Sequence, residues 1–167
     1  TDPNAFDYGA NNGGAEPSSI AASEQSNRAP LVDVQSFTGD EDTVIAGQII
    51  ATDVENDVLT YSLSGQPANG TITLDPVTGG FVYTPNANYN GPDSFIVTVT
   101  DDHGNNTTTT MNLTVTSVND APVASNQNIT TLEDTSVTGQ VVATDVESDT
   151  LSYSVSTTAA NGTVTLN

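Results

Sequence analysis

Residues 27–75 of the chain align with residues 119–167 at a constant offset of 92 positions and without a gap. About half of the paired residues are identical in the two copies. Self-similarity at a fixed period indicates a chain assembled from successive copies of one structural unit. The unit is therefore about 92 residues long, and the second copy runs a little past the middle of that unit.

The first copy has the pattern of a β-rich domain. Apolar and polar residues alternate, Val and Thr are abundant, and Gly, Asn, Asp and Pro interrupt the pattern at short intervals, whereas no segment has the period of a long helix. Seven short strands in about ninety residues are typical of a β-sandwich. The expected strands are 31–37, 44–51, 59–63, 70–74, 80–84, 94–100 and 107–116.

The repeat divides the chain into three parts. Residues 1–26 contain few large apolar side chains and are expected to form a flexible arm or linker. Residues 27–118 form a complete repeat 1, and residues 119–167 form a partial repeat 2. Repeat 2 lacks counterparts of the last strands of repeat 1, so by itself it cannot close a sandwich.

The charge of the chain limits its partners. Twenty-one Asp and Glu residues stand against a single basic residue, Arg28, which gives a formal net charge of −20. Nucleic acids and anionic membranes are excluded as partners because no basic patch exists to neutralise phosphate. The chain has no Cys and no apolar run long enough for a membrane helix. Bound cations are expected to stabilise such an acidic fold.

The residues retained between the copies are mostly loop residues, and the motif D-V-E-x-D is the most acidic of them. One interpretation is a solvated turn, because Asp and Asn form local hydrogen bonds there. The other is a site for a hard cation such as Ca²⁺, which takes six to eight oxygen ligands. The recurrence of several such groups beside Asn119-Asp120-Ala121-Pro122 favours calcium. The loop is not an EF-hand, because that motif is absent.

Several phrases together resemble a known family. E-D-T-V-I-A-G-Q-I-I-A-T-D-V-E, Y-T-P-N-A-N-Y-N-G-P-D-S-F and S-V-N-D-A-P are similar to cadherin-type repeats, especially the bacterial cadherin-like repeats arranged in tandem along large secreted surface adhesins. The resemblance covers residues 27–167. It implies an all-β, immunoglobulin/cadherin-like, seven-strand Greek-key sandwich with calcium held between successive repeats, located outside the cell on a bacterial surface.

The resemblance also implies which residues bind calcium. One group lies where the two repeats meet, and we call this region the joint. The other group lies at the opposite end of repeat 1, and we call it the upper cluster. The implied joint ligands are Glu41, Asn88, Asn90, Asn119, Asp120, Asp145, Glu147 and Asp149. The implied ligands of the upper cluster are Asp53, Glu55, Asp57 and Asp101.

Departures from the family pattern predict unequal sites. Asn88-Tyr89-Asn90 stands where cadherins carry Asp-Arg-Glu, so two amides replace carboxylates and the affinity is expected to fall. Arg28 occupies the position that Asp120 fills in the second copy, which puts a cation where a ligand is wanted. We therefore expect one good site at the joint and a weaker or empty site at the upper cluster.

Two functions are compatible with these features. The first is a calcium-stiffened structural extender of a bacterial surface adhesin, which contributes to adhesion or biofilm and contacts neighbouring repeats of the same chain. The alternative is a subunit of an extracellular filament or matrix, in which other copies of the chain complete repeat 2 by strand exchange. An enzyme is not expected, because His103 is the only His and lies in a turn without a nucleophile motif.

Overall fold

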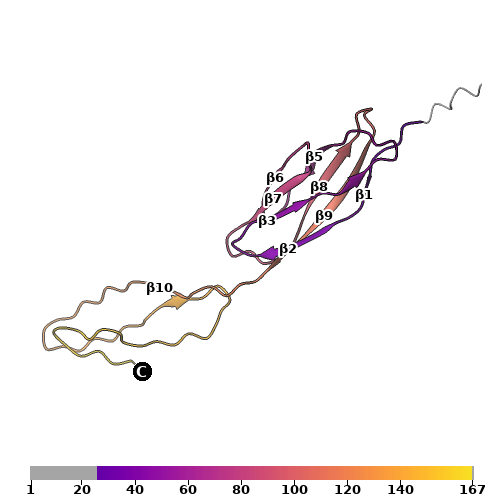
Figure 1. Cartoon of the computed structure of the whole chain (residues 1–167). Helices are drawn as coiled ribbons and strands as arrows, with labels where there is room; N and C mark the ends of the chain where they lie inside the picture. Colours follow the sequence, from indigo (N-terminus) through magenta and orange to yellow (C-terminus); the bar gives the residue numbers. More distant parts are fainter. Residues whose placement is uncertain (1–25, 167) are drawn as a thin grey trace, which may run out of the picture.

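The structure, a computed structural model, describes residues 26–166. Figure 1 shows the two repeats end to end, with repeat 1 as a compact sandwich and repeat 2 as an open arrangement beyond it. No helix occurs among the described residues, and accordingly none there could cross a membrane. The predicted linker, residues 1–26, lies outside the described part except for Ser26.

Repeat 1 contains nine strand segments. They are β1 (Leu31–Val32), β2 (Ser36–Asp40), β3 (Ile45–Gln48), β4 (Ala51–Thr52), β5 (Thr60–Gly65), β6 (Gly70–Leu74), β7 (Gly80–Pro85), β8 (Gly91–Thr100) and β9 (Asn106–Thr116).

Seven of these strands form the two sheets of the sandwich. One sheet has the order β2-β9-β8-β5 and the other the order β3-β7-β6, and β1 pairs only with β4. All pairs are antiparallel except β2 with β9, which run parallel over residues 36–40 and 112–116. Four strands facing three is the arrangement of an immunoglobulin-like sandwich, so the predicted fold class is confirmed.

The first two predicted strands are each interrupted. The strand expected at 31–37 divides into β1 and β2, and the strand expected at 44–51 divides into β3 and β4. The breaks occur because the chain changes partners there: β1 pairs with β4, whereas β2 pairs with β9 and β3 with β7. The side chain of Gln35 fills the gap by bonding to both backbone groups of Ile50.

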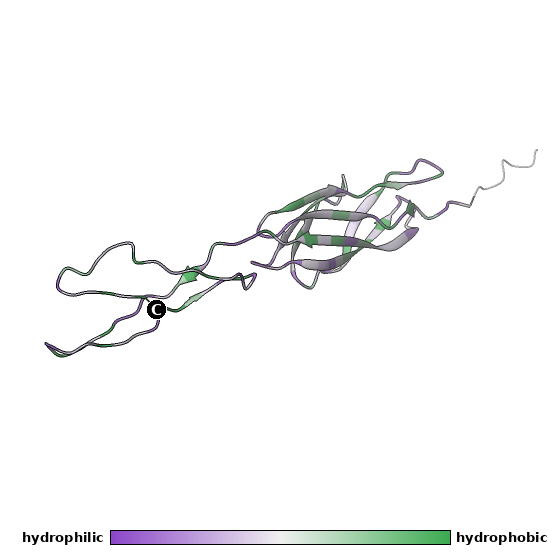
Figure 2. Ribbon diagram, turned by 90° about the horizontal axis from the view of Figure 1, so that it is seen from below, coloured by the Kyte–Doolittle hydropathy of each residue, from purple (hydrophilic) through white to green (hydrophobic). Residues whose placement is uncertain are grey.

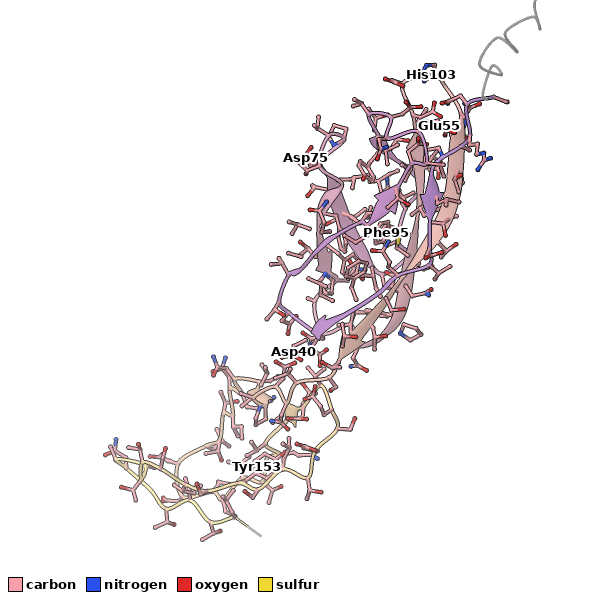
Figure 3. All side chains as sticks on the ribbon, turned by 45° about the vertical axis from the view of Figure 1, so that its right-hand side comes forward. Asp40, Glu55, Asp75, Phe95, His103 and Tyr153 are labelled. Carbon is pink, nitrogen blue, oxygen red and sulfur yellow. The ribbon has the colours of Figure 1, made fainter. Side chains whose placement is uncertain are left out.

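The core lies between the two sheets. Phe95, which Figure 3 places inside the sandwich, is 1% exposed, and the ring of Phe81 lies 5.1 Å from it and 4.7 Å from the ring of Phe37. Gly47 is required here, because an added Cβ would lie 2.6 Å from Phe81 and 2.7 Å from Phe37. As the alternation predicted, the inward residues of β8 and β9 are buried: Phe95, Val97, Val99, Met111, Leu113 and Val115.

Repeat 2 follows the path of the first half of repeat 1. Its strands are β10 (Val123–Ala124) and β11 (Ala143–Thr144), which pair as β1 and β4 do. Most of its large apolar residues are exposed: Val137 is 50% exposed, whereas its counterpart Ile45 is 4% exposed. Figure 2 shows apolar colour along these thin segments with no second layer over them. The strands that cover Ile45 in repeat 1 have no counterpart within residues 119–167.

Candidate metal centres

The predicted ligands lie in loops at the two ends of repeat 1. Figure 3 shows Glu55 and His103 at one end, and Asp40, next to Glu41, at the end that meets repeat 2. Glu41 follows β2, and Asp53 to Asp57 lie between β4 and β5. The sandwich thus separates the upper cluster from the joint.

The D-V-E-x-D loop folds as the same turn in both copies. In repeat 1 the Oδ1 atom of Asp53 accepts hydrogen bonds from the backbone nitrogens of Glu55 at 2.8 Å and Asp57 at 3.3 Å. In repeat 2 the Oδ1 atom of Asp145 accepts the equivalent bonds at 3.1 Å and 3.0 Å. The residues Asn56 and Ser148 have φ values of 61° and 63°. One carboxylate oxygen therefore builds the turn, and the second oxygen remains available for another partner.

At the joint, Glu41 binds the last residue of repeat 1, Val118. The side chain of Glu41 is 2% exposed, its Oε1 accepts a hydrogen bond from the Val118 nitrogen at 2.8 Å, and Oε2 accepts one from Nδ2 of Asn90 at 3.4 Å. On the repeat 2 side, the backbone nitrogen of Asp120 donates to Oε2 of Glu147 at 3.0 Å. Carboxylates of both repeats therefore face the joint.

Unsatisfied oxygens mark both ends of repeat 1. In the described part of the chain, three buried side-chain oxygens have no hydrogen-bond partner: Asp53 Oδ2, Asp120 Oδ2 and Glu147 Oε1. All three belong to predicted metal ligands. A buried carboxylate oxygen without a donor is costly and in proteins normally faces a donor or a cation.

The charge at the joint is uncompensated. Burial raises the pKa of Asp120 most, and the charges of Glu147, Asp42, Glu41 and Asp145 raise it further, in that order. No Lys or Arg lies in repeat 2, because Arg28 is the only such residue in the chain. The joint therefore gathers negative charge from both repeats and supplies no protein cation to balance it.

Three further predicted ligands are hydrogen-bonded to acidic residues of the joint. The backbone nitrogen of Asn88 donates to Oδ1 of Asp42 at 3.0 Å, and the side chain of Asn119 donates to the carbonyl of Asp120 at 3.0 Å. Asp149 is exposed and its backbone nitrogen donates to Asp145. Asn119 and Asp149 line one pocket together with Asp120 and Asp145. Among the described residues, no three acidic ligand atoms of the joint lie as close together as those of the opposite end of repeat 1.

The structure brings together three of the four predicted ligands of the upper cluster. Oxygen atoms of Asp53, Asp57 and Asp101 all lie within 4.8 Å of one another. Asp101 is 5% exposed and already accepts hydrogen bonds from Asn105 and from Nδ2 of Asn27. Burial raises the pKa of Asp101, but these bonds and one from the His103 nitrogen lower it by more, so the net shift is downward.

Arg28 meets the upper cluster through its backbone. Its nitrogen donates to Oε2 of Glu55 at 3.4 Å, as the nitrogen of Asp120 donates to Glu147 at 3.0 Å in the second copy. The side chain of Arg28 is exposed. The same backbone contact therefore recurs, with a basic side chain in place of the carboxylate that Asp120 contributes.

Sequence reasoning missed Asp42, Asp102 and His103. Asp42 lies close enough to Asp120 to raise the pKa of that group, and its retention in both copies of E-D-T was the available signal. The sequence indicates only a turn at His103, but its Nδ1 lies 3.1 Å from Oδ2 of Asp57 and 2.7 Å from Oδ1 of Asp102. The pKa of His103 is raised first by the charge of Asp102 and then by that of Asp57.

A family model described as "Bacterial Ig domain" matches residues 27–114 and, separately, residues 119–167. A search of curated proteins found no match. The two matched segments correspond to the two copies of the repeat and cover most of the chain.

Solved structures similar to this chain include cadherin ectodomains. Drosophila N-cadherin EC1-4 is 25% identical with a TM-score of 0.47 over 59% of this chain, and human desmocollin-1 ectodomain is 20% identical with a TM-score of 0.45 over 60%. An endo-fucoidan hydrolase of glycoside hydrolase family 107 is 22% identical with a TM-score of 0.47 over 56%. This chain spans 27%, 22% and 14% of those three chains.

Proposed function

The chain belongs to the bacterial Ig domain family, and on that basis we propose that it is a calcium-stiffened extender segment of a bacterial cell-surface adhesin. Its parts are an arm or linker of residues 1–26, repeat 1 of residues 27–118 and partial repeat 2 of residues 119–167. In this role the repeats carry no catalytic activity. They hold a distant binding domain away from the cell surface and so contribute to adhesion or biofilm.

The unpartnered pair at the joint is the observation that carries the proposal. Oδ2 of Asp120 and Oε1 of Glu147 are both buried without a hydrogen-bond donor, beside acidic groups from repeat 1. Clustered carboxylate oxygens with a nearby amide are the donor set that calcium prefers. The residues present therefore fit a calcium ion.

The chain's own residues determine how such a site would be held. Glu41 is fixed by Val118 and Asn90, and Glu147 is fixed by the backbone of Asp120. A bound calcium ion would supply the positive charge that the joint lacks. With the ion absent, the facing carboxylates repel one another and the joint acts as a hinge. Neutralising that repulsion would hold the two repeats in line.

The expected affinity and stabilisation are modest. Extracellular calcium modules bind at roughly 10⁻⁴ to 10⁻³ M. At a calcium concentration of about ten times the Kd, a single bound ion stabilises the folded protein by roughly 1.4 kcal/mol.

The proposed ligands of the joint are Glu41, Asn88, Asn90, Asn119, Asp120, Asp145, Glu147 and Asp149, and those of the weaker upper cluster are Asp53, Glu55, Asp57 and Asp101.

Calcium titration tests this function. Melting temperature and end-to-end length would be measured in calcium-free buffer and at increasing calcium concentrations. The chain has no Cys, so single Cys residues placed at each end allow distance measurement with two dyes. We expect a higher melting temperature and a narrower distance distribution with calcium. If neither quantity changes up to millimolar calcium, the proposal is wrong.

Exposed apolar residues in repeat 2 favour a second candidate function. Val137 is 50% exposed and Val141 is 48% exposed, whereas their counterparts in the closed sandwich of repeat 1, Ile45 and Ile49, are 4% and 1% exposed. In a self-assembling filament or matrix, strands from another copy of the chain would cover them. Sizing of the 167-residue chain over a range of concentrations separates the two functions, because a monomer at all concentrations contradicts assembly.

A further inference from the structure

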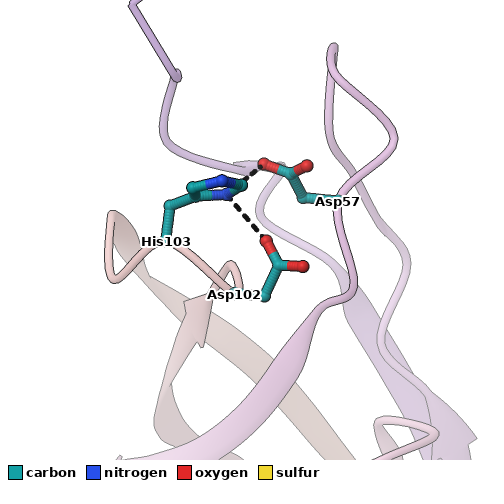
Figure 4. A group of neighbouring side chains, drawn as sticks. All are labelled: Asp57, Asp102 and His103. Atoms are coloured by element: carbon teal, nitrogen blue, oxygen red, sulfur yellow. Dashed lines mark hydrogen bonds and ion pairs between the residues drawn. The ribbon is translucent and has the colours of Figure 1, made fainter.

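We propose that Asp57, Asp102 and His103 form a second site next to the upper cluster, for a borderline transition-metal dication such as Zn²⁺. The three residues come from two loops, since Asp57 lies between β4 and β5 whereas Asp102 and His103 lie between β8 and β9. Figure 4 shows the imidazole ring between the two carboxylates. A cation held there would join two loops that are 46 positions apart in the sequence.

The distances fit ligands around one cation. Nδ1 of His103 lies 3.1 Å from Oδ2 of Asp57 and 2.7 Å from Oδ1 of Asp102, and the three ligand atoms lie within 4.8 Å of one another. Adjacent ligands of a zinc ion, bound at about 2.0–2.2 Å, are separated by about 2.9 Å in an octahedron and about 3.4 Å in a tetrahedron. The nitrogen carries at most one proton, which cannot bond well to both carboxylates, whereas a metal ion contacts all three groups.

Charge and accessibility also favour a metal ion. The chain contains a single Lys or Arg, so almost no side-chain cation competes for these carboxylates. The side chain of Asp57 is 14% exposed, while those of His103 and Asp102 are 59% and 51% exposed. A partly buried carboxylate with two accessible ligands gives the ion a route in, and leaves coordination positions for water.

The imidazole nitrogen separates this site from the calcium ligands. Calcium and magnesium prefer oxygen, whereas imidazole favours zinc, copper and nickel. Asp57 belongs to both sets, because its other group consists of Asp53 and Asp101. Asp57 can therefore bridge a hard cation on one side and a softer one on the other. The proposal goes beyond calcium stiffening and does not depend on calcium at the joint.

The only imidazole of the chain makes a direct test practical. Protein without a polyhistidine tag would be titrated with ZnCl₂ in metal-free buffer and again with excess CaCl₂, by calorimetry and by NMR of the His103 ring protons. We expect one zinc equivalent whose binding shifts these ring signals in both buffers. NiCl₂ would broaden the same signals selectively. Unaffected ring signals up to millimolar zinc would overturn the proposal without any substitution.

Matched variants assign the ligands. His103→Asn and Asp102→Asn should each weaken zinc binding by about tenfold or more, a loss that even changes outside the ligand shell can cause. Asp33→Asn, which makes the same chemical change at an exposed residue that belongs to neither group of potential metal ligands, should bind zinc as the parent does. Equal zinc affinity in His103→Asn and the parent overturns the proposal. A lost calcium response with intact zinc binding contradicts only the proposed function.

Discussion

The side-chain amide of Gln35 donates a hydrogen bond to the carbonyl oxygen of Ile50 at 2.9 Å and accepts one from its backbone nitrogen at 3.1 Å. This pair of bonds replaces strand pairing at the point where β1 gives way to β2 and β3 gives way to β4. The second copy retains a Gln at the equivalent position, Gln127. The side chain of Gln35 thus takes the place of a backbone-to-backbone hydrogen-bonded pair at the point where the chain passes from one sheet to another.

Gln35→Ala should destabilise repeat 1. The substitution removes both hydrogen bonds to the backbone of Ile50. Because Ile50 is 62% exposed and water can replace the lost partner, the expected loss is about 0.5–1.5 kcal/mol, the net contribution of a typical hydrogen bond. Urea unfolding would measure the loss as a lower midpoint with an unchanged slope. Gln66→Ala, at an exposed position, serves as the control and should leave the midpoint unchanged. Equal midpoints for the two variants would show that the Gln35 bridge contributes nothing.

Asp93→Asn should reduce both stability and its dependence on acid pH. Asp93 accepts bonds from the backbone nitrogens of Ala68, Asn69 and Ser94 and from the hydroxyl of Tyr83. Burial raises the pKa of Asp93, but these bonds lower it by more, so the net shift is downward. The charged carboxylate therefore stabilises the native state above the unfolded pKa of about 3.9, and this contribution disappears as pH falls through the folded pKa.

The measurement is urea unfolding between pH 7 and acid pH. The parent should lose stability as the pH falls below about 4, and Asp93→Asn should be weaker at neutral pH and show a shallower decline. Asp33→Asn controls for the loss of one charge from an acidic surface. An acid profile in Asp93→Asn that is parallel to that of the parent would contradict the assignment.

Glu147→Gln should have opposite effects with and without calcium. Without the ion, the change removes a charge that raises the pKa of Asp120, so repulsion at the joint falls. With the ion, a carboxylate ligand is lost, and calcium affinity should fall about tenfold, equivalent to ~1.4 kcal/mol. Calcium calorimetry and the dye-to-dye distance report the two effects. Glu133→Gln, an exposed position in the same repeat, is the matched control and should change neither.

Arg28→Asp should strengthen calcium binding at the upper cluster. It gives repeat 1 the residue that Asp120 provides in repeat 2, next to Glu55 in place of Glu147. Arg28→Gln removes only the positive charge, so comparison of the two variants separates repulsion from ligation. We expect a small gain for Gln and about tenfold for Asp by calorimetry. Identical affinities in the two variants would mean that removal of the positive charge accounts for the whole effect and that the added carboxylate does not bind calcium.

The sandwich of repeat 1 could be predicted from the sequence, because apolar residues that form its core alternate with polar residues along the strands. Phe95, Val97 and Val99 lie at every second position of β8, and all are buried as that spacing predicted. The breaks within the first two strands could not be predicted in this way. These breaks depend on a contact between residues 35 and 50. The alternation of apolar and polar residues does not indicate which sheet a strand joins.

The acidic loops could be identified in part from the sequence, because the same motif occurs in both copies of the repeat. Comparison of the copies identified Asp53 and Asp145 as retained loop residues, but it could not show that one oxygen of each builds a turn. His103 has no counterpart within residues 119–167, so comparison of the copies gave it no weight. Its approach to Asp57 depends on two loops meeting in space, which spacing along one loop cannot reveal.

The parallel pairing of β2 with β9 determines how repeat 1 responds to a pulling force. These strands are the first and last of the sandwich, and they pair from Ser36 with Asn112 to Asp40 with Thr116. Tension applied to the two ends of the repeat slides the strands past each other, so the hydrogen bonds are loaded together in shear and are not opened one after another. Repeat 1 is thus arranged to resist extension along its own axis.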